Sequence, residues 1–182
     1  MRSVRGTLFV DYVRMLRARK DVDWSRHLES QDLAYLNERI APDAWYPMGT
    51  FERMGLAILA EITDDVQIAR GWGRAQIDWL HSHEDKLIVP GDPCDTLMRF
   101  RVLRSGFFDF SALDIPSLHD GEVVVQVDYG MSPRAEEAAS WQTLGFFERL
   151  LEMAGARGVQ SCFLSTSWTG DLVTTIQLRW EA

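Results

Sequence analysis

The segment from His81 to Asp85 holds the residue types most typical of a metal site, two histidines followed by two carboxylates. Histidines two positions apart can share a divalent ion where the backbone is extended. On a helix they would point about 200° apart, because each residue turns the helix by about 100°. No further histidine or cysteine with ligand spacing accompanies them. We therefore expect a polar helix end here and no metal site.

Other segments with catalytic residue types each lack part of a motif. Gly71-Trp72-Gly73-Arg74 has glycines but no lysine-serine ending, so we interpret them as permitting close helix packing or a helix break. Cys94 has no identifiable activating base. We predict no catalytic activity. An enzyme acting on a small apolar substrate would need Asp109, Asp114 or Glu122 to face a closed cavity.

Aromatic side chains are more numerous than a core of this size needs, with seven tryptophans and nine phenylalanines in 182 residues. Such a surplus favours an apolar pocket or a surface that binds a partner. The expected occupant is a small apolar molecule or another protein. The candidate pocket walls lie on a central helix, on the sheet side and on a long helix: Met54, Ile58, Phe100, Phe108, Trp141 and Phe147.

The overall charge excludes some classes of partner. A net charge of -8 argues against general nucleic-acid or anionic-membrane binding, which needs a clustered basic face. The basic residues from Arg14 to Lys20 are interpreted as the solvated last turn of a helix. The two cysteines form no Cys-x-x-Cys pair and the N-terminus has no long apolar stretch, so we expect a cytoplasmic protein without membrane insertion.

The elements that would position these residues form a helical half and a sheet-containing half. We expect one domain over residues 1–182, with the halves at about 1–90 and 94–182 and the Pro90–Pro93 loop between them. Apolar periodicity predicts helices in the first half. Their ranges are Thr7–Arg19, Gln31–Ile40, Phe51–Ile62 with Thr50 as a cap, and Val66–His81, with an aromatic corner at Trp45–Pro47.

The second half has the clearest punctuation in the chain. Glu122–Tyr129 is rich in β-branched residues, and Ser132-Pro133 then starts a helix that should run to about residue 154. The other predicted elements are a strand at Leu97–Leu103, a strand or aromatic turn at Phe107–Ser111, a loop at Pro116–Gly121, and a closing hairpin of Val159–Ser165 and Leu172–Trp180. The fold class is α+β with an antiparallel sheet of about four to five strands.

This order of elements resembles a superfamily of haem nitric oxide/oxygen-binding sensors, 4-vinyl reductase domains and TRAPP small subunits. Several short motifs resemble a myxobacterial branch of that group. They are Gly6-Thr7-Leu8-Phe9, Trp45-Tyr46-Pro47, Leu144-Gly145-Phe146-Phe147 and Trp168-Thr169-Gly170-Asp171. The resemblance implies a sensor or adaptor domain. Such a domain would signal by ligand occupancy or by protein pairing, and the pairing could be that of a homodimer.

The same resemblance raises the question of haem. The haem sensors carry a Tyr-x-Ser-x-Arg signature for the haem propionates, which Tyr129, Ser132 and Arg134 resemble with one extra residue between tyrosine and serine. Those sensors also present a proximal histidine on a helix before the sheet, whereas Leu97–Ile115 contains none. The sequence therefore leaves open whether the protein binds haem or another cofactor. The alternative hypothesis is a haem or metal sensor with an unusual ligand: His81, His83 or His119.

Overall fold

The computed structural model describes residues 2–62, 65–83 and 86–181, without the side chain of His83. Contacts group the chain into two compact units. The helical unit comprises Met1–Asp65 with Ser105–Phe110, and the sheet unit comprises Val66–Arg104 with Ser111–Ala182. The division falls before the fourth predicted helix, not at the Pro90–Pro93 loop. That the two units form one domain stays a prediction.

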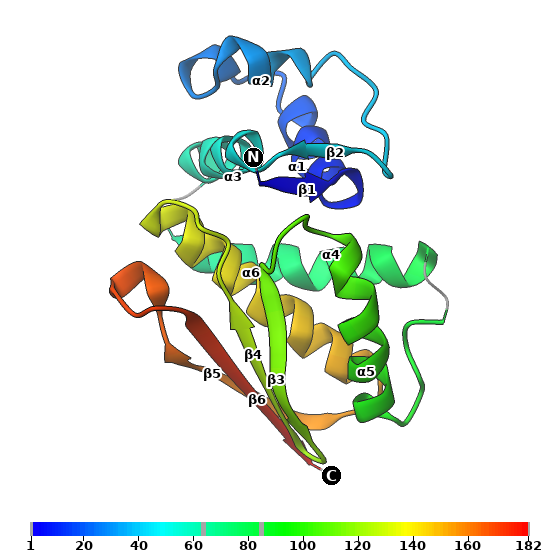
Figure 1. Cartoon of the computed structure of the whole chain (residues 1–182). Coiled ribbons are helices and arrows are strands. Elements are labelled where there is room, and N and C mark those ends of the chain that lie inside the picture. The colour runs from blue at the N-terminus through cyan, green and yellow to red at the C-terminus, as the bar shows by residue number, and fades with distance from the viewer. Residues whose placement is uncertain (1, 63–64, 84–85, 182) are drawn as a thin grey trace. The chain divides into compact units, whose positions relative to one another are not determined.

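The helical unit is built on two amphipathic helices, α1 (Gly6–Ala18) and α3 (Met48–Ile62). The buried stripe of α1 includes Phe9, whose ring stacks on Tyr46 with the centroids 4.5 Å apart. The short strands β1 (Ser3–Arg5) and β2 (Trp45–Pro47) pair antiparallel, so the predicted aromatic corner is part of a ribbon. The 3-10 turn η1 (Trp24–Arg26) and α2 (Ser30–Ala34) complete the unit (Figure 1).

Two expectations for the helical unit are corrected. Thr50 does not cap α3, because it lies inside the helix and its hydroxyl donates to the buried Asp32 carboxylate at 2.7 Å. The helix predicted over Gln31–Ile40 ends at Ala34. The chain beyond it is held by Arg17 from the last turn of α1, which donates to the carbonyls of residues 35, 36 and 38. The Arg17 guanidinium is therefore hydrogen-bonded within the helical unit.

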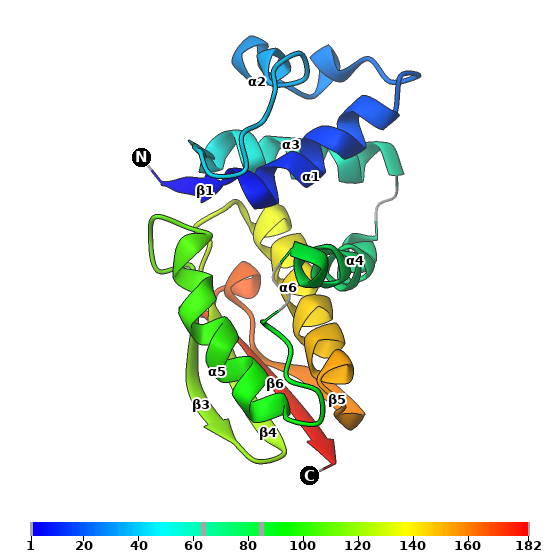
Figure 2. The same ribbon diagram turned by 90° about the vertical axis from the view of Figure 1, so that its right-hand side faces the viewer.

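The sheet unit consists of a four-stranded antiparallel sheet with helices against it (Figures 1 and 2). The strand order is β3-β4-β6-β5. The elements in chain order are η2 (Val66–Ile68), α4 (Ala69–His83), α5 (Pro93–Leu103), η3 (Arg104–Gly106, which crosses the unit boundary), β3 (Leu113–His119), β4 (Glu122–Val127), α6 (Pro133–Met153), β5 (Arg157–Ser165), η4 (Ser167–Thr169) and β6 (Thr174–Glu181).

The fold class, the long helix and the closing antiparallel pair are confirmed. Pro133 begins α6 as predicted, and left-handed glycines follow its end, where Gly155 has φ 96°. Alternate residues of β4, such as Val123 and Val125, are fully buried. The predicted loop at Pro116–Gly121 is wrong, since most of it belongs to β3, where Pro116 lies on an edge strand that tolerates proline.

The strand predicted at Leu97–Leu103 is also wrong, because these residues form the end of α5. Asp92 caps this helix by accepting from the Asp95 amide at 2.8 Å, and Pro93 follows as its first residue. Leu97 and Phe100 are buried three residues apart, whereas Met98 is 50% exposed. The polar-apolar alternation that suggested a strand was therefore coincidental. The Phe107–Ser111 segment is an aromatic turn that bridges to β1 through Val4 and Phe108.

Helices α4 and α6 cross at very close range. A Cβ on Gly73 would lie 1.8 Å from the Gln142 carbonyl oxygen, and a Cβ on Gly145 would lie 2.0 Å from the Arg70 carbonyl oxygen. Only glycine permits such an approach of two backbones. The expectation that glycines in the Gly71–Arg74 segment serve close helix packing is confirmed for Gly73.

A buried carboxylate joins the same two helices to the sheet. Glu148 of α6 accepts two hydrogen bonds from Arg70, at 2.7 and 2.8 Å, and one from Ser161 of β5 at 2.5 Å. Arg74 lies within 3.5 Å of it. Because a buried charge is tolerated when it is paired and hydrogen-bonded, this cluster fixes the register of α4 on α6. Within the described residues, no helix has the length and apolar character needed to cross a membrane.

Candidate ligand pocket

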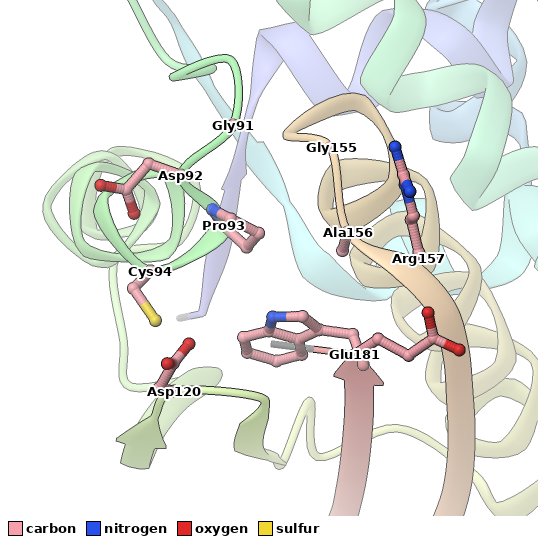
Figure 3. A pocket seen from close by; sticks show the side chains of 10 residues that line it. Gly91, Asp92, Pro93, Cys94, Asp120, Gly155, Ala156, Arg157 and Glu181 are labelled. Atoms are coloured by element: carbon pink, nitrogen blue, oxygen red, sulfur yellow. The ribbon is translucent and has the colours of Figure 1, made fainter.

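A pocket of about 670 Å³ opens within the sheet unit, near the ends of α5, α6 and β6 (Figure 3). Four segments distant in sequence supply its lining. They are the start of α5, the β3–β4 turn, the α6–β5 turn and the end of β6, contributing Gly91, Asp92, Pro93, Cys94, Asp120, Gly155, Ala156, Arg157, Trp180 and Glu181. A volume of this size is in the range that holds a small organic molecule.

Two left-handed glycines support the wall of the pocket. Gly91, with φ 79°, donates from its amide to the Ala154 carbonyl at 2.9 Å. A Cβ on Gly155 would lie 3.3 Å from the Gly91 backbone, so the two turns touch without side chains between them. On the opposite side, the Trp180 amide donates to the Gly121 carbonyl at 3.0 Å and ties β6 to the β3–β4 turn. These backbone contacts give the pocket a defined shape.

Charge is distributed unevenly around the pocket. Asp92, Cys94 and Asp120 lie on one side, and Arg157 and Glu181 lie on the other (Figure 3). Burial raises the pKa of the Cys94 thiol, and the negative charges of Asp120 and Asp92 raise it further. The thiol donates to the His119 carbonyl, with sulfur and oxygen 3.7 Å apart. Cys94 is therefore poorly suited to act as a nucleophile, in agreement with the sequence-based interpretation.

The six candidate wall residues are divided between the two units. Met54, Ile58 and Phe108 belong to the helical unit, and the other three belong to the sheet unit. Phe100 and Phe147 pack edge to face with their ring centroids 5.1 Å apart. Phe100 and Phe108 do not lie on the sheet, because one is on α5 and the other is in the aromatic turn. None of the six lines the pocket described above, and their role in binding stays a prediction.

The residues of the propionate-like motif are placed differently from one another. Tyr129 is buried, and its hydroxyl lies 2.6 Å from the Thr143 hydroxyl oxygen. Thr143 donates its own proton to the Ala139 carbonyl, so Tyr129 acts as the donor to Thr143. Burial raises the pKa of Tyr129 above its ordinary range. Ser132 and Arg134 are exposed at the start of α6.

The Tyr129 hydroxyl thus forms a hydrogen bond within the sheet unit. We expect Tyr129→Phe to lower the free energy of unfolding by about 1 kcal/mol, the usual net value of one hydrogen bond. Chemical denaturation measures this loss. In a double-mutant cycle with Thr143→Val, the two changes should cost less together than the sum of each alone, because they remove the same contact. Strict additivity would contradict the contact.

Neither His81 nor His119 fits proximal haem ligation. The helix before the sheet is α5, and Pro93–Leu103 contains no histidine. His119 is at the exposed end of β3, and His81 lies on α4 with a buried Nδ1 that has no hydrogen-bond partner within the described residues. The side chain of His83, with Glu84 and Asp85, is outside the described part of the chain. In the part of the chain that the structure describes, the helix before the sheet therefore offers no proximal ligand for haem.

Acidic residues considered for catalysis are engaged elsewhere. Asp109 accepts from the Ser3 amide at 2.6 Å, and Asp114 and Glu122 pair with Arg104 and Arg179. None of the three lines the pocket. In the described ranges, no group of three or more histidine, cysteine or acidic side chains is arranged to hold a metal ion.

Sequence patterns did not identify the pocket. Its lining residues are separated by up to about half the chain and include no motif. The available signal was the Pro90–Pro93 loop together with the glycine-containing α6–β5 turn, since left-handed glycines allow backbones to approach closely. Only the structure shows that these two turns meet, through the hydrogen bond from the Gly91 amide to the Ala154 carbonyl.

Comparison with known proteins identifies the architecture. No protein-family model matches the sequence, and no curated protein matches it significantly. Among solved structures, an H-NOX protein from S. oneidensis in the Fe(II) state aligns with a TM-score of 0.68 at 11% identity, covering 98% of this chain and 96% of that one. A T. tengcongensis H-NOX mutant gives 0.63 at 11% identity, covering 98% of both chains.

An oxygen-binding H-NOX domain related to soluble guanylate cyclases aligns similarly, with a TM-score of 0.62 at 11% identity over 98% of this chain and 95% of that one. Because identity is this low, the alignments establish the fold and not a shared ligand. They agree with the element order and with the antiparallel sheet described above. The chain therefore has the fold of the haem nitric oxide/oxygen-binding (H-NOX) domains.

Proposed function

We propose that this protein is a non-enzymatic ligand-sensing or adaptor domain that uses the H-NOX fold without a proximally ligated haem. The observation that carries the proposal is the absence of histidine from α5, the helix that precedes the sheet. Likeness to gas-binding domains over 98% of the chain supports a sensing role, and the internal use of the Tyr129 hydroxyl argues against a propionate contact. Signalling would follow from ligand occupancy or from pairing with a partner or a second copy.

A haem-loading experiment tests this proposal. We expect protein expressed with a haem precursor to be purified without a Soret absorption band. The oxygen-binding H-NOX domain prepared in parallel serves as the positive control. A stoichiometric Soret band in this chain would contradict haem independence. Native mass spectrometry of the same sample reports any other bound molecule and the number of subunits, which separates ligand sensing from pairing.

A second candidate function rests on His81. Its Nδ1 is buried without a hydrogen-bond partner in the described part of the chain, which is unusual for a polar atom and is compatible with a missing ligand. The alternative is a haem or metal sensor that uses this histidine. If haem or metal binds to the wild type and is lost in His81→Ala but retained in His119→Ala, this alternative replaces the first.

A further inference from the structure

The pocket of the sheet unit presents more negative than positive charge. Three carboxylates, from Asp92, Asp120 and Glu181, line it against the single guanidinium of Arg157. Arg157 and Glu181 are opposite each other in the β5–β6 register, yet they form no ion pair within the described residues. Asp120 also has no ion-pair partner there. Exposed carboxylates that are not neutralised internally attract a cation.

Trp180 supplies a second observation, independent of the charges. Its side chain is only 7% exposed and lines the pocket. Its indole nitrogen makes no hydrogen bond within the described residues. The same nitrogen is not sealed from solvent. The indole can only donate. Because this N–H opens to the pocket while the rest of Trp180 is buried, it is free to donate to a ligand with an acceptor oxygen.

These two observations specify complementary parts of one ligand. We propose that the pocket binds a small organic amine whose ammonium group lies against Asp92 and Asp120 and whose carbonyl oxygen accepts from the Trp180 indole and Arg157. The geometry of the lining agrees with this polarity, since the two aspartates and Arg157 lie on opposite sides (Figure 3). Pro93 and Ala156 provide apolar surface between them. The inference rests on the proposed ligand-binding function and names its ligand class.

Three probes with the same side chain test the requirement for charge. L-leucinamide carries an ammonium and a carbonyl group, L-leucine is a zwitterion, and N-acetyl-L-leucinamide is neutral. Each is titrated into ¹⁵N-labelled full-length protein while the Trp180 indole signal, assigned with Trp180→Phe, is followed by NMR. We expect a saturable shift with leucinamide, weaker binding of leucine and no shift with the neutral probe. Calorimetry gives the affinities independently of the Trp180→Phe variant.

Charge-neutralising variants locate the binding. Asp92→Asn retains a side chain able to cap α5, and Asp120→Asn retains a turn-forming residue. We expect the double variant to bind leucinamide about tenfold more weakly, because each exposed carboxylate contributes modestly. Asp95→Asn is the matched control. It removes one negative charge near the start of α5, as Asp92→Asn alone does, but Asp95 pairs with Arg99 at 3.0 Å and does not line the pocket.

Several results would overturn this inference. They are equal binding of the neutral probe, tighter binding of leucine than of leucinamide, no saturable binding by any probe, or an equal loss of affinity in Asp95→Asn. The absorption spectrum of the same sample separates the two proposals. No Soret band together with no amine binding removes only the ligand class, whereas a Soret band removes the proposed haem independence whatever the amine result.

Discussion

Gly145→Ala is expected to destabilise the protein by about 3 kcal/mol, at the upper end of the usual range for overpacking. The added methyl would lie 2.0 Å from the Arg70 carbonyl oxygen and 3.0 Å from the Arg70 Cα. Both are backbone atoms, so no side chain can rotate away and α4 must move from α6. That movement also disturbs the hydrogen bonds between Arg70 and Glu148.

The neighbouring helix provides a matched control. Gly71 on α4 has no atom within 4 Å of an added Cβ. Gly71→Ala should therefore raise the free energy of unfolding by about 0.5–1 kcal/mol, because alanine loses less backbone entropy in a helix. Urea denaturation of both variants and the wild type measures the contrast. If Gly145→Ala unfolds at the wild-type midpoint, the two helices do not approach this closely in solution.

This contrast shows which parts of the fold local sequence determines. The start of α6 at Pro133 and the closing strands were predictable, because capping residues, proline and β-branched runs act locally. That Leu97–Leu103 belongs to a helix was not predictable from these residues alone, because their alternation of polar and apolar side chains favours a strand. The helix start at Asp92-Pro93 is the local signal against that interpretation. Likewise, Gly71 and Gly73 look alike in sequence, and only the position of α6 distinguishes them.

The candidate site was less predictable than the fold, for a related reason. A pocket wall made by Asp92, Asp120 and Glu181 depends on the loop before α5, the β3–β4 turn and the end of β6 lying close together. No periodic pattern encodes that meeting. By contrast, the missing histidine of α5 was visible in the sequence, because a required residue type can be absent whatever the structure around it.

The helical unit contains its own structural test, at Asp32. Asp32→Asn should lower the free energy of unfolding by about 3 kcal/mol, as when one partner of a buried ion pair is removed. The Asp32 carboxylate is fully buried and accepts two hydrogen bonds from Arg53, at 2.6 and 2.7 Å, and one each from Thr50 and the Glu29 amide. The lower end of the known range is expected, because Arg53 remains partly accessible to water.

The pH dependence of this loss has a defined sign. Burial alone would raise the pKa of Asp32, but the hydrogen bonds from Arg53, Thr50 and the Glu29 amide outweigh it and hold the pKa below its ordinary value of 3.8. The unfolded chain therefore binds the proton more readily. The stability that Asp32 contributes is present above about pH 4 and disappears as the pH falls through the folded-state pKa. The difference between Asp32→Asn and wild type should shrink in that window.

Asp11 on α1 is the control with the opposite sign. Burial raises its pKa, and Arg14 at 3.7 Å only partly offsets the effect. Ionisation of Asp11 thus disfavours the folded state as the pH rises through the interval between its unfolded and folded pKa values. Asp11→Asn should leave stability at neutral pH unchanged or slightly higher. If Asp32→Asn also leaves stability at pH 7 unchanged or higher, burial outweighs ion pairing at both sites, and the Asp32–Arg53 pair does not anchor the helical unit.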